Sequence, residues 1–217
     1  MAPALLQAFA RRATNVEATL GIAAATEMRA LLSERLADVA VGPALAGPGA
    51  PAIVSEPLLR YRLLLVAGHG HRLHRSAPVT WRELRDEEWF VDPTGTDPES
   101  ELGRLLARAG VPETCVRVFP TQAAAWAAAA GGTGVAPAVE QQWNRDRHPD
   151  VAPLPVTGLP LDVFWHVSML RGDRRSTTAA RLARLLTTSD ATQAMYRADG
   201  GVPASQFRPP VYVTIWR

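Results

Sequence analysis

The sequence predicts an α/β fold, in which strands and helices alternate along the chain. Short apolar runs typical of buried strands are separated by stretches in which apolar residues recur with helical spacing. Hydrophobic residues make up 47% and charged residues 20% of the 217 residues, a balance typical of globular domains. This length is sufficient for one large domain or for two smaller lobes with separate cores.

The N-terminal part is predicted to form helix, strand, helix and strand. Apolar residues have helical spacing over 3–12, and residues 16–22 alternate apolar and polar side chains as a strand does. Thr26 is expected to cap a second helix, and residues 39–41 to form a short buried strand. The short connection predicts a parallel βαβ unit. The apolar face of the second helix is expected to comprise Met28, Leu31, Leu32 and Leu36.

The middle of the chain continues the alternation after a Pro/Gly loop at 43–51. Strands are predicted at 63–66, in a run of Leu and Val, and at 89–91, and a short helix capped by Thr80 lies between them. A longer helix is expected to begin at Asp97-Pro98, with Asp as the cap and Pro in the first turn, and to end at Gly110. Its apolar face comprises Leu102, Leu105 and Leu106.

The C-terminal part is predicted to add further strands and helices. A strand at 116–118 leads through Pro120 and Thr121 into an Ala-rich helix over 122–130. A buried strand at 135–136 precedes a helix that carries Val139 and Trp143. The remaining predicted elements are a long strand over 161–170, helices over 177–187 and 189–197, and a strand over 211–216.

Charge and composition argue against several classes of protein. All 23 basic residues are arginine, and they are scattered among 21 acidic residues with a net charge of only +2, so direct nucleic-acid binding is not expected. The single cysteine, Cys115, excludes an intrachain disulfide and is expected to pack as a small apolar residue. No apolar run approaches the roughly 18 residues that span a bilayer, and no signal peptide is recognisable, so we expect a cytoplasmic protein without membrane contact.

Five stretches, taken in this order and with this spacing, carry a resemblance to a known family. They are LLSERLADVAVGP, EPLLRYRLLLVAGHGHRLHRSAPVTWREL, EEWFVDPTGTDPESELGRLLARAGV, VRVFPTQAAAWAAAAGGTGVAPAVEQQW and LPLDVFWHVSMLRGDRRSTTAARLARLL. Together they resemble the effector-binding domain of LysR-type transcription regulators over nearly the whole chain.

The resemblance implies a type 2 periplasmic-binding-protein-like fold, with two α/β lobes joined by two crossover strands. Residues 1–62 with 164–217 would form lobe I, and residues 63–163 would form lobe II. A small-molecule effector, such as an organic acid or an aromatic metabolite, would bind between the lobes and change their relative angle. Helices 3–12 and 98–109 correspond to the family's dimer elements. The resemblance therefore implies a homodimer whose interface would include Leu6 and Leu105.

Three parts of the family pattern are not found in this sequence. These are the winged helix-turn-helix, the linker helix and the first strand of lobe I, so DNA would be contacted only through an N-terminal domain that this chain lacks. We hypothesise that the strand at 211–216 adds to the lobe I sheet in place of the absent edge.

Candidate effector contacts lie at turns and strand-to-helix junctions. The N-terminus of a helix offers free N–H groups to an anion. The same residues are also explained by capping and turn formation alone, and Asp92 and Asp97 would oppose an anion. The candidate effector-binding residues are Gly42, Pro43, Pro93, Thr94, Gly95, Thr96, Pro120, Thr121, Gln122 and Gly134.

Metal and catalytic sites are not expected. His69, His71 and His74 share a turn, but no fourth ligand lies nearby, so we expect neither a metal nor another cofactor. Ser100 has no evident base beside it, and we find no paired carboxylates or nucleophile motif, so an enzyme is not expected. The alternatives to an effector domain are a solute-binding protein of the same fold, an enzyme on that fold, or a truncated remnant that binds no ligand.

Overall fold

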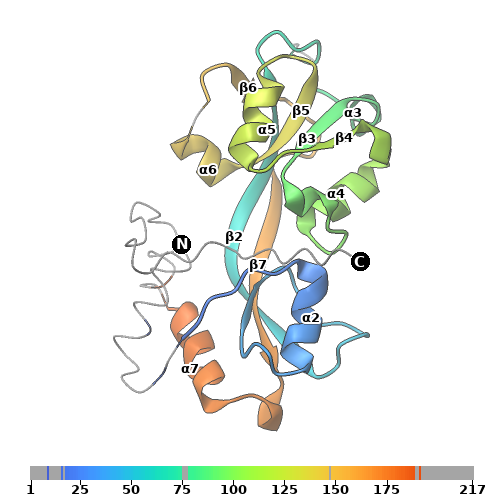
Figure 1. Cartoon of the computed structure of the whole chain (residues 1–217). Helices are drawn as coiled ribbons and strands as arrows, with labels where there is room; N and C mark the ends of the chain where they lie inside the picture. The colour runs from blue at the N-terminus through green and yellow to red at the C-terminus, as the bar shows by residue number, and fades with distance from the viewer. Residues whose placement is uncertain are drawn as a thin grey trace, which may run out of the picture. The chain divides into compact units, whose positions relative to one another are not determined.

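The chain is described in a computed structural model for residues 18–74, 78–146 and 148–188, together with Phe9, Val16 and Ala191. It divides into two compact units. Unit 1 takes the described residues up to Leu58 and from Val167, and unit 2 runs from Leu59 to His166. Two long strands, β2 (Ile53–Gly68) and β7 (Leu161–Leu170), contribute residues to both units (Figure 1). The resemblance implied boundaries at 62/63 and 163/164.

Unit 1 is a small sheet with one main helix on each face. Its strands follow the order β1 (Ala40–Gly42), β7 and β2. Val167 and Met169 on β7 pack against α7 (Thr177–Leu186), whereas Leu170 packs with residues of α2 (Ala25–Ser33). A short 3-10 turn, η3 (Gly172–Arg174), joins β7 to α7. The alternation of side chains along β7 therefore gives each helix its own core.

Unit 2 is a mixed sheet with the order β2, β5, β3 and β4, and β6 pairs with β2 on the other side. The strand β3 is parallel to both β4 and β5, and β2 is antiparallel to β5 and β6. The bounds are β3 Glu88–Val91, β4 Val116–Val118, β5 Gly134–Val139 and β6 Val151–Pro153. The helices are α3 Trp81–Leu84, α4 Glu101–Ala109, α5 Gln122–Ala129 and α6 Glu140–Arg145, with 3-10 turns η1 Pro93–Thr96 and η2 Glu113–Cys115.

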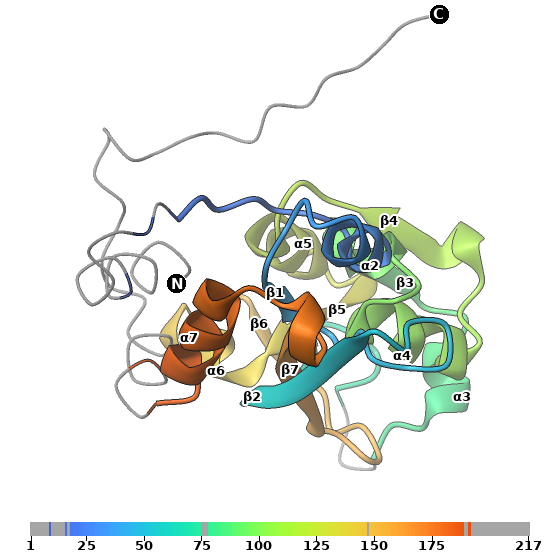
Figure 2. The same ribbon diagram turned by 90° about the horizontal axis from the view of Figure 1, so that it is seen from below.

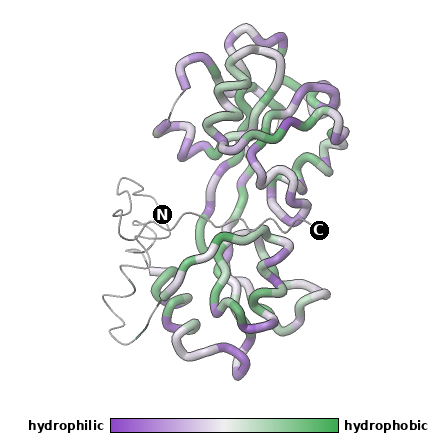
Figure 3. The backbone as a smooth tube through the Cα atoms, viewed as in Figure 1, coloured by the Kyte–Doolittle hydropathy of each residue, from purple (hydrophilic) through white to green (hydrophobic). Residues whose placement is uncertain are grey.

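The sheet of unit 2 is covered on both faces (Figures 1 and 2). Leu63, Leu65 and Ala67 on β2 face a core that includes the apolar residues of α3 and α4. The intervening Leu64 and Val66 face a second core with α5 and α6. A strand buried on both faces needs a continuous apolar run, which is the pattern seen at 63–67 (Figure 3).

Several predicted boundaries are confirmed. Thr80 caps α3, and the α4 face of Leu102, Leu105 and Leu106 is buried. Gly110 ends α4 with a left-handed φ of 66°, which glycine adopts without the steric cost that a side chain carries. The strand at 63–66 is correct but is part of a longer element, β2.

Two predictions near the N-terminus are wrong. Residues 18–24 lie in no helix or strand, and Leu20 and Ile22 are exposed, because a strand needs a partner and none of the described strands pairs there. The predicted βαβ unit therefore lacks its first strand. The second helix begins after Ala24 rather than Thr26, since the Glu27 carboxylate accepts the Ala24 N–H at 3.2 Å.

Three further expectations are corrected. Leu36 is 71% exposed, because α2 ends at Ser33 and Leu36 therefore does not share the helix face of Leu32. The helix expected at Asp97 begins only at Glu101, with Ser100 as its cap. Val139 ends β5 instead of opening a helix, because its backbone pairs with Leu63 on β2.

Four predictions concern residues outside the described part of the chain. These are the helix at 3–12 apart from Phe9, the helix at 189–197 apart from Ala191, the strand at 211–216, and Leu6 as a dimer contact.

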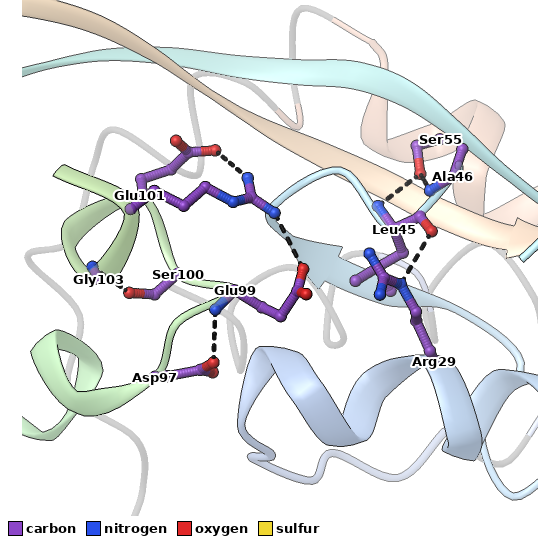
Figure 4. A network of polar contacts seen from close by, with 10 residues as sticks. Arg29, Leu45, Ala46, Ser55, Asp97, Glu99, Ser100, Glu101 and Gly103 are labelled. Atoms are coloured by element: carbon purple, nitrogen blue, oxygen red, sulfur yellow. Dashed lines mark hydrogen bonds and ion pairs between the residues drawn. The ribbon is translucent and has the colours of Figure 1, made fainter. Parts of the chain in front are cut away.

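A serine pair, Ser55 and Ser168, holds the loop that follows β1 in unit 1. Figure 4 shows Ser55 beside Leu45 and Ala46. The Ser55 Oγ accepts the backbone N–H groups of Leu45 and Ala46, each at 3.0 Å. It also lies 2.7 Å from the Oγ of Ser168, which is 1% exposed. Because two donors occupy the lone pairs of Ser55, its own proton is donated to Ser168.

We expect Ser55→Ala to lower the free energy of unfolding by about 1–3 kcal/mol, because two backbone N–H groups and a buried hydroxyl lose their partner. Urea unfolding measures this change. The matched control is Ser33→Ala at the exposed end of α2, which should change stability by less than about 0.5 kcal/mol. Equal effects of the two substitutions would contradict this role for Ser55.

A buried histidine organises the turn that follows β2 in unit 2. His71 is 4% exposed, and its Nδ1 accepts the Leu73 N–H at 3.2 Å. The Nε2 therefore carries the proton and faces the Glu87 carboxylate at 3.4 Å. Glu87, 6% exposed, also accepts from the Arg72 guanidinium. Burial lowers the pKa of His71 below 6.5, and Arg72 and His74 act in the same direction, opposed by Glu87.

We expect acid to destabilise unit 2 through His71. A group with a lowered pKa in the folded state binds more protons when unfolded, so the stability is present above about pH 6.5 and is lost as pH falls through the folded-state pKa. Protonation also removes the acceptor for the Leu73 N–H. His71→Asn keeps an acceptor but does not titrate, so its urea midpoint should fall less between pH 7.5 and 5.5 than that of the wild type. Parallel pH profiles would contradict this role.

Candidate functional site

Three parallel strands of unit 2 end at one edge of the sheet. The parallel pairing of β3 with β4 and β5 sends their carboxyl ends in the same direction. The Phe119 N–H donates to the Val91 carbonyl at 2.8 Å, so the ladder continues past β4 and the segments after β3 and β4 leave the sheet side by side. Open α/β sheets commonly bind ligands beyond this edge.

The segment after β3 is the 3-10 turn η1, which satisfies most of its own polar groups. The Asp92 Oδ1 accepts the Thr94 N–H at 3.0 Å and the Thr94 hydroxyl at 2.5 Å. The Thr96 hydroxyl donates to the Pro93 carbonyl at 2.8 Å. Thr94 and Thr96 remain exposed, so their hydroxyl oxygens can still accept a hydrogen bond from a ligand.

Ser100 anchors this turn to α4 (Figure 4). Its hydroxyl donates to the Thr94 carbonyl at 2.6 Å and accepts the Gly103 N–H at 2.8 Å. The residue is 8% exposed. Both hydrogen-bonding roles of the hydroxyl are therefore used inside the protein, and Ser100 acts as a helix cap that fixes the position of Thr94.

The segment after β4 leads into α5. The Thr121 Oγ1 accepts the Ala124 N–H at 3.2 Å, so Thr121 caps the helix, which is one of the two roles that the sequence leaves open for it. The Gln122 Nε2 donates to the Pro137 carbonyl at 3.3 Å, and the Trp126 Nε1 donates to the same carbonyl at 3.0 Å. Because Pro137 lies on β5, these two bonds hold the start of α5 against the sheet.

An ion pair that the sequence does not predict lies beside the end of β5. Arg62 on β2 binds both carboxylate oxygens of Glu140 at 2.6 and 2.7 Å. The register that places Leu63 opposite Val139 brings these two side chains together. They are 78 residues apart in the chain, and only the pairing of β2 with β5 could have revealed the contact.

The predicted site residues differ in exposure, and two of them lie in unit 1 while the others lie in unit 2. Exposed at the carboxyl edge are Pro93, Thr94, Thr96, Pro120 and Thr121, with Gln122 half-buried beside them. Gly42 is the last residue of β1 in unit 1, and Pro43 follows it. Gly42 is buried, and a Cβ there would lie 3.5 Å from the Met28 sulfur.

The two remaining glycines are needed for packing. A Cβ on Gly95 would lie 2.7 Å from the Val91 side chain, and one on Gly134 would lie 2.5 Å from the Glu88 carbonyl. Gly134 pairs with Glu88 at the amino ends of β5 and β3, the opposite edge of the sheet from Thr94 and Thr121. Within unit 2, the structure therefore does not bring Gly134 together with the candidates that follow β3 and β4.

The three histidines after β2 use ring nitrogens inside the protein. The Nε2 of His69 lies 3.0 Å from the Pro149 carbonyl, and that of His74 lies 3.2 Å from the Ala67 carbonyl. His71 is held by Leu73 and Glu87, as described above. Within residues 18–74, 78–146 and 148–188, no group of three or more His, Cys, Asp or Glu is arranged to hold a metal ion.

No helix in the part of the chain that the structure describes has the length and apolar character needed to cross a bilayer.

The sequence matches a family model described as LysR substrate binding domain over residues 1–191. Two curated relatives are uncharacterized HTH-type transcriptional regulators, MT0391 and Rv0377, from two strains of Mycobacterium tuberculosis. Each is 29% identical over 227 residues, with 99% of this chain and 67% of the relative covered.

Solved structures share the fold at low sequence identity. The Synechocystis PCC6803 CcmR regulatory domain in complex with 2-PG has a TM-score of 0.64 at 21% identity, covering 85% of this chain and 88% of that one. The regulatory domain of NMB2055 (MetR) from N. meningitidis has a TM-score of 0.69 at 16% identity, covering 85% of each chain. The BenM effector binding domain with benzoate has a TM-score of 0.63 at 16% identity, covering 95% and 91%.

These structures confirm the predicted α/β class and its periplasmic-binding-protein-like fold. Two of these structures are named as regulatory domains and one as an effector binding domain, and the MetR protein is named as a LysR family regulator. The family match covers most of the chain. The chain therefore belongs to the LysR substrate binding domain family, the effector-binding domains of LysR-type transcription regulators.

Proposed function

We propose that this domain senses a small organic effector, an organic acid or an aromatic metabolite, at the carboxyl edge of β3, β4 and β5. The observation that carries the proposal is the convergence of exposed hydroxyls from two neighbouring strand-to-helix junctions, Thr94 and Thr96 after β3 and Thr121 after β4. The carboxyl edge of parallel strands is where open α/β sheets commonly place ligands.

The hydroxyls offer complementary hydrogen-bonding roles. Thr121 accepts from the Ala124 N–H, which leaves its proton available to donate to an effector. Thr94 and Thr96 donate to Asp92 and Pro93, which leaves their oxygens available to accept. The arrangement suits an effector that carries an acceptor, such as a carboxylate, next to α5 and a hydroxyl or amine donor next to η1.

Charge supports placing an acidic group at α5. The first turn of a helix carries partial positive charge, which favours an anion beside Thr121. The Asp92 carboxylate lies at η1 and would repel an anion on that side. Three of the similar structures are named as complexes with 2-PG, benzoate or shikimate, which is the kind of small organic molecule proposed.

We propose that binding shifts the domain between two states that a DNA-binding region distinguishes. A ligand shifts such an equilibrium only by its difference in affinity for the two states. The curated relatives are HTH-type regulators, and the match covers 67% of their length, so contact with DNA is assigned to a part of the regulator outside the matched region. Because a regulator acts where the DNA is, we propose a cytoplasmic location.

The homodimer implied by the resemblance stays a proposal, and Leu105 is not the residue to test it. Leu105 is 4% exposed and packs in the core of unit 2, so a charge there would disrupt folding. Ala107 and Arg108 on the same helix are exposed and are better positions for interface variants.

We expect a thermal-shift screen of carboxylates and aromatic compounds to give a hit. A ligand at about a hundred times its dissociation constant adds roughly 2.7 kcal/mol, which moves the Tm of a domain of this size by several degrees.

Substitution of Thr121 links the hit to the proposed edge. Thr121→Asp keeps a good N-cap acceptor but replaces the donor hydroxyl with a negative charge, so the Tm without ligand should stay close to that of the wild type and the shift for an acidic hit should be lost. The matched control, Thr121→Ser, keeps the hydroxyl and should keep the shift. An undiminished shift in Thr121→Asp would place the effector elsewhere.

A further inference from the structure

A separate candidate site lies in unit 1, where β7 ends and α7 begins. A cavity of about 270 Å³ is lined by Arg35, which follows α2, and by Arg174 and Arg175, which follow β7. Leu170 contributes an apolar part of the wall. The proposed effector edge uses none of these residues.

None of the three arginines has an ion-pair partner in the described part of the chain. Among the described residues, no carboxylate lies within 4.0 Å of the guanidinium of Arg35, Arg174 or Arg175. The Arg175 Nη1 lies 3.8 Å from the Met169 sulfur, a weak acceptor. Asp38 and Asp173 also line the cavity, so its ionised side chains sum to three positive and two negative charges, a net charge of +1.

The N-terminus of α7 opens onto the same cavity but is already occupied. The Ser176 Oγ accepts the Ala179 N–H at 3.0 Å and donates to the Asp38 carboxylate at 2.8 Å. The negative charge of Asp38 therefore lies at the partly positive N-terminus of α7, and its carboxylate already accepts a hydrogen bond from Ser176. Recognition at this site rests on the guanidinium groups and not on the helix terminus.

We propose that this cavity binds a small oxyanion, a carboxylate or phosphate group on a metabolite, as a second ligand site of the domain. A planar guanidinium matches both groups with two parallel hydrogen bonds. The volume is slightly below the roughly 300–1,000 Å³ typical of pockets for larger ligands, which suits a small molecule. The cavity volume of about 270 Å³ admits a single small group and not a DNA duplex.

The chain offers variants that test each wall. Arg174→Gln with Arg175→Gln removes two charges after β7. Arg35→Gly removes the third and suits the backbone, because Arg35 has a φ of 60°, in the region that favours glycine. Arg181→Gln, on an exposed position of α7 outside the cavity, is the matched control.

The experiment titrates the 15N-labelled chain with inorganic phosphate and with succinate, against sodium chloride at the same ionic strength. We expect amide shifts at 35–38 and 171–176 that saturate with at least one of the two oxyanions and not with chloride. The dissociation constant should rise by about tenfold or more in the double variant and in Arg35→Gly, and stay unchanged in Arg181→Gln. The stronger of the two probes distinguishes a phosphate ligand from a carboxylate ligand.

Two results would overturn the proposal. One is shifts that follow ionic strength alike for all three salts, or that survive in the arginine variants. The other is binding of a DNA duplex to these arginines with no response to either oxyanion, which would assign them to a nucleic-acid backbone.

Discussion

The parallel pairing of β3 with β4 and β5 is the constraint on which the candidate site depends. It sends three chain segments out of the sheet at the same edge, and the Phe119 to Val91 hydrogen bond extends the pairing to the point where the junctions begin. Thr94 and Thr121 lie 27 positions apart in the chain, yet both sit at this edge. If β4 ran antiparallel to β3, the segments that follow the two strands would leave the sheet at opposite edges, and these hydroxyls would lie far apart.

Packing against the same sheet restricts the polarity and the size of the surrounding residues. Both faces of β2 are buried, so consecutive residues from Leu63 to Ala67 must be apolar. Close contact leaves no room for a side chain at Gly95 or Gly134. Loops are then held by single hydroxyls that bond in two directions, Ser100 beneath η1 and Ser55 beneath the loop after β1. Packing positions the elements, and a few buried polar groups fix the turns between them.

The sequence predicts features that depend only on neighbouring residues, such as helix caps. Thr80 is predicted as a cap and is one, because capping involves only the next turn of the helix. Capping is one of two roles that the sequence leaves open for Thr121, and the structure shows it as a cap. Asp97 and Ser100 are both residue types that cap helices well. Ser100 caps α4 in the structure, and its hydroxyl also bonds to the Thr94 carbonyl, a contact between two turns that the local sequence does not reveal. The alternation over 16–22 indicated a strand, but a strand also needs a partner, which local alternation cannot supply.

The site itself was partly predictable for the same reason. The junctions after β3 and β4 were found because cap and turn residues mark them, whereas Gly134 was grouped with them although it lies at the other edge of the sheet. The ion pair of Arg62 with Glu140 joins residues distant in sequence and has no local signature. The cavity lined by Arg35, Arg174 and Arg175 likewise arises only when the end of α2 meets the end of β7.

Amide chemical-shift mapping of the 15N-labelled chain with the strongest organic-acid or aromatic hit tests the central claim most directly. We expect the largest changes at 93–96 and 120–123, the two junctions beside the parallel strands. Saturable binding that leaves these amides unchanged, with the largest changes elsewhere in the chain, would contradict it.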